Sequence, residues 1–158
     1  MGVSTDAILC YGFQFKDEEG REKEGAPEWL IDEATGEEMM LDDFLARLVG
    51  LPEPLEHFDE ERYASDPAYK SAWSEHWKRK RALEDEHGVE IVLHCSDSYP
   101  MYILAVKASV QTASRGSLIE LGQALSVGPE WRETIRSFCE RAKIPFEEPQ
   151  LILCSYWG

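Results

Sequence analysis

The sequence lacks any apolar run that approaches the roughly 20 residues needed to cross a membrane. Its N-terminus also lacks the basic and apolar stretches of a secretory leader. The four cysteines, Cys10, Cys95, Cys139 and Cys154, are too far apart for a metal knuckle, so we expect buried free thiols. These absences predict a protein of the reducing cytoplasm with no membrane partner.

Catalytic and cofactor motifs are missing as well. No serine stands in a glycine-flanked nucleophile elbow, and no loop combines the glycine spacing and lysine of a phosphate-binding P-loop. None of the acidic runs has the spacing of a calcium loop. We therefore assign no catalytic residue, no cofactor and no metal ligand, and we expect a binding protein rather than an enzyme.

Positive charge is scarce in the first part of the chain. Residues 1–66 hold 19 Asp or Glu residues against 5 Lys or Arg residues, whereas residues 67–158 hold 12 against 11. A one-sided negative field repels nucleic acid and attracts a basic protein surface. The densest acidic runs supply the candidate partner-binding residues: Asp17, Glu18, Glu19, Glu37, Glu38, Asp59, Glu60 and Glu61.

Helix signals are strongest in the middle of the chain. Ser65-Asp66-Pro67 predicts the start of a helix that runs to about His87, with Tyr69, Trp73 and Trp77 on a face that would pack into the core. A shorter helix is predicted with Asp42 or Asp43 as its cap, Leu41, Phe44, Leu45 and Leu48 at helical spacing, and an end at Gly50 and Pro52. A third helix starts after Gly128-Pro129-Glu130 and ends before Pro145.

Runs of β-forming residues predict strands at 6–15, 89–95, 101–110 and 150–156. The 158 residues suit one domain, and the order strand, helices, strand, strand, helix, strand matches a split βαβ arrangement. We predict an α+β fold in which two or three helices cover one face of an antiparallel sheet of about four strands, in a ferredoxin-like order. Residues 16–66 form an acidic, loop-rich, insertion-like region within this domain.

A second candidate site gathers His94, Asp97 and Tyr99 of the predicted hairpin with Ser114 and Arg115 of a small-residue loop. In an extended chain His94 and Asp97 point to opposite sides, which argues against a catalytic triad. The loop offers backbone N–H groups and a guanidinium to an anion, although a plain turn explains the same residues. A small enzyme or ligand-binding domain using these residues is the alternative function.

Four segments resemble parts of small proteins encoded by bacteriophages and prophages: STDAILCYG at 4–12, VEIVLHCSDSYPMYILAV at 89–106, TASRG at 112–116 and CSYWG at 154–158. The resemblance implies an accessory factor that acts in the host cytoplasm by binding host machinery, as anti-CRISPR-type defence inhibitors do. It assigns no catalytic residue and leaves the oligomeric state open. We therefore expect a phage accessory protein that binds a basic surface on a host nucleic-acid-binding or defence complex.

Overall fold

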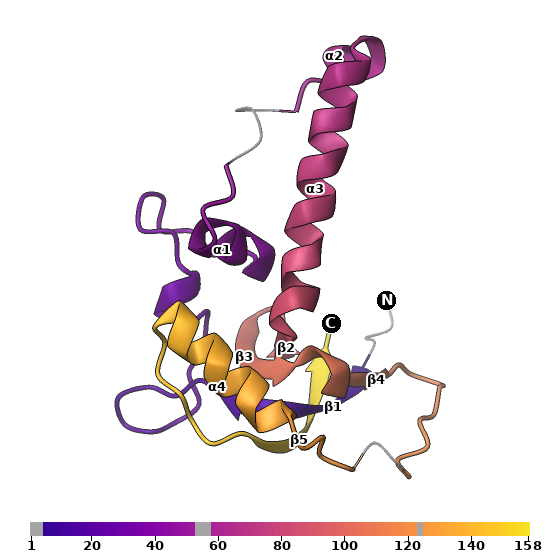
Figure 1. The fold of residues 1–158 in the computed structure, drawn as a ribbon. Helices are drawn as coiled ribbons and strands as arrows, with labels where there is room; N and C mark the ends of the chain where they lie inside the picture. Colours follow the sequence, from indigo (N-terminus) through magenta and orange to yellow (C-terminus); the bar gives the residue numbers. More distant parts are fainter. Residues whose placement is uncertain (1–4, 53–57, 123–124) are drawn as a thin grey trace.

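The structure is a computed structural model that describes residues 5–52, 58–122 and 125–158 (Figure 1). Its elements, in chain order, are β1 (Thr5–Gln14), η1 (Glu28–Leu30), α1 (Leu41–Leu48), α2 (Glu60–Ser65), α3 (Pro67–His87), β2 (Val89–Ser96), β3 (Tyr99–Val106), η2 (Lys107–Ser109), β4 (Gln111–Ala113), α4 (Trp131–Ala142) and β5 (Gln150–Trp157). Together they form one α+β domain, which confirms the predicted fold class.

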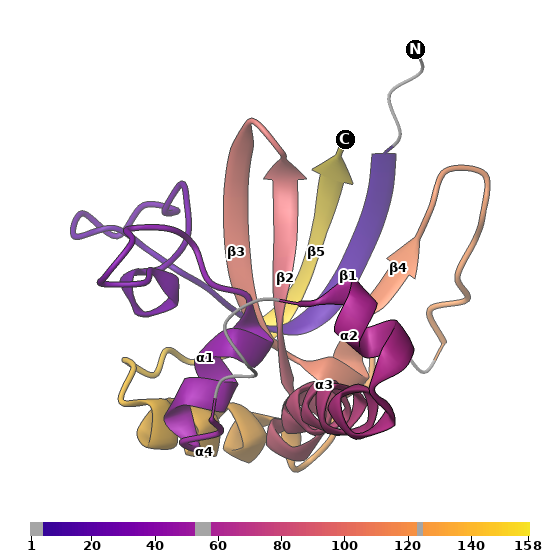
Figure 2. The same ribbon diagram turned by 90° about the horizontal axis from the view of Figure 1, so that it is seen from above.

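The sheet contains five strands in the order β3-β2-β5-β1-β4 (Figure 2). β1 pairs antiparallel with β5, and β2 pairs antiparallel with β3. A further antiparallel ladder joins the end of β1 to β3, so these ladders also follow the split βαβ order β5-β1-β3-β2. A short parallel contact between the ends of β2 and β5 closes the four strands into a ring.

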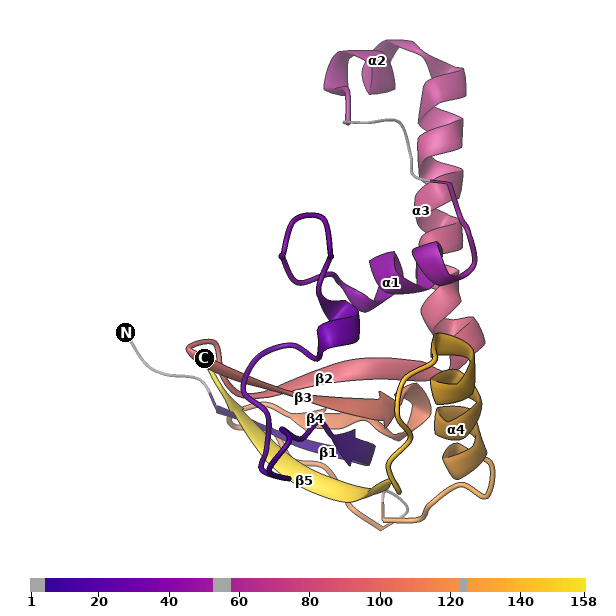
Figure 3. The same cartoon turned by 90° about the vertical axis from the view of Figure 1, so that its left-hand side faces the viewer.

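Closure of the ring gives the strands two buried faces, because successive side chains of a strand point in opposite directions. In β1, Cys10 belongs to a cluster with residues of β2, β3 and β5, while Tyr11 and Phe13 belong to a second cluster with the helices. Figure 3 shows β2 and β3 above β1 and β5. The first cluster therefore fills the inside of the ring, and the second joins the ring to α1, α3 and α4.

Helix ends follow the sequence signals closely. The Asp66 carboxylate accepts hydrogen bonds from the backbone N–H groups of Ala68 and Tyr69, and α3 ends at Gly88 with φ 66°. α4 starts directly after Glu130, and its predicted apolar stripe is buried at Ile135, Phe138 and Cys139.

The predicted cap of α1 is wrong. Met40 occupies the cap position and no side chain caps the helix. Asp42 and Asp43 instead form ion pairs with Lys80 of α3. The buried cation of Lys80, on a neighbouring helix, competes for the same carboxylates, and the sequence spacing around residue 41 gives no sign of this contact.

The predicted packing of α3 is also wrong. The helix projects away from the sheet, with α2 at its far end, and α1 lies beside the half nearer the sheet (Figures 1 and 3). Only its last turns, at Leu83 and His87, are buried near the sheet. An apolar stripe shows which face of a helix is covered but does not identify the segment that covers it. In α3, Phe58 contacts Trp73 of the projecting part, and α1 contacts Lys80.

Two short elements were not predicted, namely α2 and β4. Both fall where the sequence reads as loop, in 51–64 and 111–116, since elements of six and three residues are too short to show a period. The acidic region 16–66 thus contains η1, α1 and α2, and its residues 53–57 lie outside the described residues. The Trp157 side chain near the end of β5 is exposed.

Candidate functional site

The most prominent surface feature is the projecting part of α3 together with α2, residues 58–80, which we call the arm (Figure 1). Aromatic rings run along one side of it. The ring centroid of Phe58 lies 5.1 Å from that of Trp73, which lies 6.0 Å from that of Trp77. Tyr63 of α2 adds a contact of 5.3 Å to Phe58. The arm therefore carries a continuous aromatic ladder rather than isolated rings.

The described part of the chain covers the ladder only in part. Phe58 is 50% exposed, and Tyr63, Trp73 and Trp77 keep part of their surface in solvent. Only Tyr69 is fully buried, where its hydroxyl accepts a hydrogen bond of 3.1 Å from the Asp59 backbone N–H. A large aromatic side chain buries 150–250 Å² when it is covered, so covering it stabilises the protein. A contiguous group of partly exposed aromatic residues is therefore typical of a surface that binds a partner.

Two cations beside the outer rings of the arm, Arg62 and Lys70, are already engaged. The Arg62 guanidinium lies 4.7 Å from the centre of the Tyr69 ring and forms an ion pair with Asp66. The Lys70 ammonium similarly lies over the Tyr63 ring, at 5.3 Å. The carboxylates of Glu60 and Glu61, in contrast, stand exposed in the first turn of α2. The accessible charge at the α2 end of the ladder is therefore negative, whereas Lys78 stands exposed at the Trp77 end.

The base of the arm is held by a buried cation. Lys80 is 5% exposed, and its ammonium forms ion pairs with Asp43 and, at 3.4 Å, with Asp42 of α1. The same ammonium lies 4.5 Å from the centre of the Trp77 ring. Two carboxylates and an aromatic face compensate the desolvation of this charge. The contact fixes the direction in which the arm leaves the domain.

The eight predicted acids occupy three separate places (Figure 1). Asp17, Glu18 and Glu19 lie in the loop after β1, Glu37 and Glu38 precede α1, and Asp59, Glu60 and Glu61 begin α2. In the first group Arg21 holds the Asp17 carboxylate, and backbone and side-chain hydrogen bonds from Arg21 lower the pKa of Asp17. Only the third group lies beside the aromatic ladder.

The residues of the second predicted site are divided between opposite edges of the sheet (Figure 2). His94, Asp97 and Tyr99 belong to the β2–β3 hairpin, whereas Ser114 and Arg115 follow β4, with β5 and β1 between them. The structure therefore does not bring the candidate anion-binding loop to the hairpin.

Within the hairpin, His94 and Asp97 have different partners. The Gln14 amide nitrogen lies 3.4 Å from His94 Nε2, and burial lowers the pKa of His94. The Asp97 carboxylate accepts a hydrogen bond from the Tyr156 hydroxyl, which raises the pKa of Tyr156. Tyr99 stands 60% exposed at the turn. These contacts give each polar group a structural role.

The thiols are free, as expected, with Cys10 and Cys139 buried and Cys95 and Cys154 partly buried. Burial raises the pKa of Cys10 to about 12 and that of Cys139 to about 11. Such thiols are protonated at neutral pH and are poor nucleophiles. Within the described ranges, no three His, Cys, Asp or Glu residues come together in a way that could hold a metal ion.

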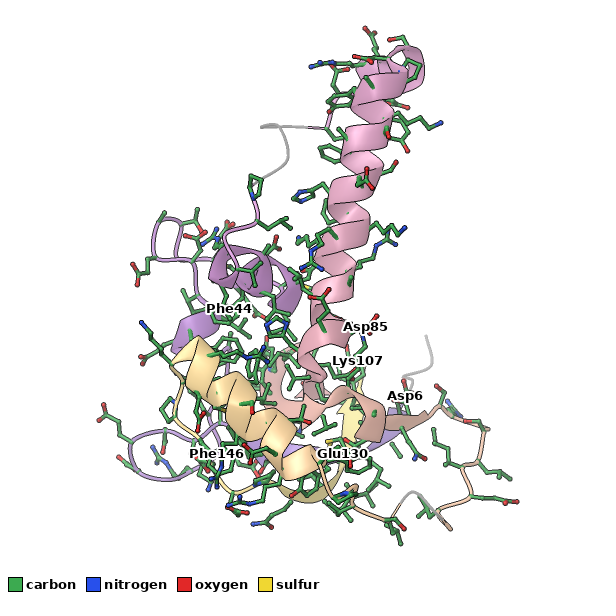
Figure 4. The ribbon with its side chains drawn as sticks, in the orientation of Figure 1. Asp6, Phe44, Asp85, Lys107, Glu130 and Phe146 are labelled. Atoms are coloured by element: carbon green, nitrogen blue, oxygen red, sulfur yellow. The ribbon has the colours of Figure 1, made fainter. Side chains whose placement is uncertain are left out.

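One cleft lies beside α4 and another lies beside η1. The first, of about 360 Å³, lies between the end of α3, η2 and the start of α4; Asp85, Lys107 and Glu130, labelled in Figure 4, are among the residues that line it. Lys107 is engaged there by Asp85 at 2.7 Å, and this contact raises the pKa of Lys107. The other, about 460 Å³, lies beside Trp29 and Phe44 and is crossed by the Arg47–Asp32 ion pair.

Comparison of the chain with protein-family models, with curated proteins and with solved structures gave no match. No helix among the described residues is both long enough and apolar enough to span a membrane. The functional argument therefore depends on the surfaces and clefts described above, of which the arm is the most exposed.

Proposed function

We propose that this chain is a binding protein that docks the arm against a basic surface of another protein. The observation that carries the proposal is the partly exposed aromatic ladder of Phe58, Trp73 and Trp77 on a helix that projects from the domain. Tryptophan and tyrosine dominate the energetic centres of protein interfaces, where they fill desolvated pockets of the partner.

The charge of the arm supports a basic partner. The excess of acids lies in its outer part: residues 58–77 contain five Asp or Glu residues against two Lys or Arg residues, and both of those cations lie over rings of the arm. Lys78, Arg79 and Lys80 follow at its base, where Arg79 pairs with Glu86 and Lys80 with Asp42 and Asp43. Acids at the rim of an aromatic patch accelerate association with a positive surface and make the binding sensitive to salt. The same charge disfavours nucleic acid as the direct partner.

The resemblance of four segments to phage proteins supports a host protein as that partner. We propose an accessory role in the host cytoplasm, in which the arm occupies a basic surface that a nucleic-acid-binding or defence complex uses for its own ligand. Inhibition then follows from occupancy, without catalysis.

The test begins with capture of partners from a bacterial host lysate at low salt, followed by affinity measurements with the purified partner. Trp73→Ala should weaken binding by about 30-fold or more, which is the loss expected of a central interface aromatic. Glu60→Gln with Glu61→Gln should weaken it less and reduce its dependence on salt.

The matched control is Glu18→Gln with Glu19→Gln, which removes the same charge from the loop after β1. This control should bind the partner as the unmodified chain does. Equal affinity for the Trp73→Ala variant, with its fold intact by circular dichroism, would rule out the arm as the docking surface. A larger loss in the control than in the α2 variant would move the acidic contact to the loop.

A further inference from the structure

The outward face of β5 and β1 lies on the side of the ring away from α1 and α3 (Figure 3). Ile152 and Cys154 of β5 pack inside the ring with Ile8 and Cys10 of β1. Because successive side chains of a strand alternate in direction, the residues that flank these four point outward. The exposed members of this outward set, which we call the neutral face, are Leu151, Leu153, Ser155 and Trp157 of β5 with Thr5 and Ala7 of β1.

The large side chains of the neutral face are apolar. Leu153 is 71% exposed, Trp157 is 56% exposed, and Leu151 is exposed as well. A strand with one face in water usually alternates apolar and polar residues, whereas a strand that is buried on both faces is apolar throughout. The sequence of β5 is of the second kind, and the described part of the chain covers only one of its faces.

Charge distinguishes the neutral face from the rest of the surface. Asp, Glu, Lys and Arg make up 30% of the chain, which has a formal net charge of −15, but none of them belongs to the neutral face or to residues 149–158. Two copies of so acidic a chain repel each other, and the repulsion is least where the surfaces that meet carry no charge. A basic partner, in contrast, finds no carboxylate here with which to pair.

The neutral face also has a shape that complements itself. Ser155 and Ala7 lie opposite each other in the β1–β5 ladder, and two small side chains leave a shallow hollow. Leu153, the most exposed large residue of the face, projects beside this hollow. A projection and a hollow at neighbouring positions of one strand fit each other when the same face is turned over onto itself.

We propose that the neutral face joins two copies of this chain across a two-fold axis that crosses β5 between Leu153 and Ser155. The axis sets the two β5 strands antiparallel, in sheets stacked about 10 Å apart. Leu153 of each copy then lies against Ser155 and Ala7 of the other. Trp157 of each copy lies against Leu151 of the other. Such a contact uses the same residues on both copies and closes at two.

The size of the neutral face sets the strength of the dimer. Its six residues are fewer than the roughly 20–30 residues that each side contributes to a stable interface of standard size. The dissociation constant should therefore lie in the micromolar range, at about 10–100 µM. The dimer is independent of the proposed function, because the arm and β5 lie on opposite sides of the domain (Figure 3).

The experiment is sedimentation equilibrium of the full chain from about 1 µM to about 500 µM. The chain should pass from monomer to dimer over this range. Raising sodium chloride from about 50 mM to about 500 mM should tighten the dimer, because salt screens the repulsion between the acidic copies. A chain that stays monomeric at the highest concentration overturns the proposal, and so does association that continues beyond the dimer.

Leu153→Ser should weaken the dimer by about tenfold or more, since each copy loses an apolar side chain from the centre of the contact. Leu118→Ser is the matched control, because Leu118 is 81% exposed in the loop after β4 and does not belong to the neutral face. Both positions are exposed, so both variants should fold, and circular dichroism checks this. Equal weakening in the two variants would place the contact elsewhere and overturn the proposal.

Ala7→Leu separates the proposed packing from general hydrophobic association. The added side chain fills the hollow that receives Leu153, so it should weaken the dimer by about tenfold. A tighter dimer in this variant would show that any apolar surface suffices and that the two-fold packing is wrong. Trp73→Ala should leave the dimer unchanged, so failure of the neutral face and failure of the arm are separate results.

Discussion

Gly12 allows β1 to contact β3 and so to close the ring. It lies opposite Ala105 in the β1–β3 ladder, and a Cβ atom added to it would lie 2.8 Å from the Ala105 Cα and closer still to the Leu104 carbonyl oxygen. These neighbours are backbone atoms, which cannot move aside as a flexible side chain does.

Gly12→Ala should therefore lower the free energy of unfolding by about 2–3 kcal/mol, as overpacking of a core commonly does. Urea unfolding followed by tryptophan fluorescence measures the change. Gly122→Ala is the control, because nothing lies within 4 Å of the added Cβ there. Similar stability of the two variants would show that the β1–β3 approach tolerates a side chain.

His94 makes the stability of the chain depend on pH. Burial lowers its pKa in the folded protein, with a smaller opposing effect of Glu22, whereas an unfolded histidine titrates near pH 6.5. The unfolded chain then binds more protons than the folded chain between the folded pKa and about 6.5. Stability should consequently fall as the pH drops through this window.

His94→Gln tests this expectation, because glutamine keeps a polar side chain but does not titrate. Urea unfolding at several values between pH 7.5 and pH 5 should show a shallower loss of stability for the variant than for the unmodified chain. Parallel pH profiles would mean that other groups cause the loss.

At the scale of elements, α3 combines two regions of different stability. Its last turns pack on the core through Leu83, whereas its first turns lie beside α2, away from the core cluster. Backbone hydrogen bonds with few buried apolar contacts open locally at low cost. The N-terminal turns of α3 should therefore exchange their amide hydrogens faster than the turns near Leu83.

Asp66→Ala should accelerate exchange further in the first turn of α3, because Asp66 accepts hydrogen bonds from the Ala68 and Tyr69 amides. The local cost is about 1 kcal/mol, while global unfolding changes little. Native-state hydrogen exchange by NMR measures both quantities. Ser71→Ala, on the exposed side of the same helix, should not accelerate exchange, and an equal effect of the two changes would contradict the cap.

At the scale of the whole molecule, the negative charge is spread over several surfaces, which leaves self-repulsion in the folded state. The formal net charge is −15, and Glu18, Glu37 and Glu61 are exposed acids from the three separate acidic groups. Salt screens repulsion between exposed charges beyond about 10 Å at 0.1 M. Added salt should therefore raise the stability of this chain.

The triple change of Glu18, Glu37 and Glu61 to glutamine should raise the melting temperature at low salt and weaken its dependence on salt. Calorimetry between 10 mM and 300 mM sodium chloride measures both effects. Lys78→Gln removes an exposed positive charge and should act in the opposite direction. A triple variant less stable than the unmodified chain would mean that these acids have favourable partners.

Much of the fold could be predicted because the strong elements carry complete local signals. The cap and glycine of α3, the apolar stripe of α4 and the β-rich runs of β1 and β5 each identify an element without tertiary contacts. The short α2 and β4 lack such signals and depend on neighbours. The candidate site could be predicted only in part, since Glu60 and Glu61 adjoin the ladder while the other acids lie elsewhere.

The sequence by itself determined the α+β class, the order of the long elements and the excess of acids, because periodicity, capping residues and charge are local properties. Tertiary structure alone decided that α3 projects from the domain, that Lys80 holds Asp42 and Asp43, and that the Tyr102 hydroxyl donates to Glu38. Each of these depends on which surfaces meet. A helical stripe or an acidic run specifies that a side chain needs a partner, and only packing of distant segments specifies which partner it receives.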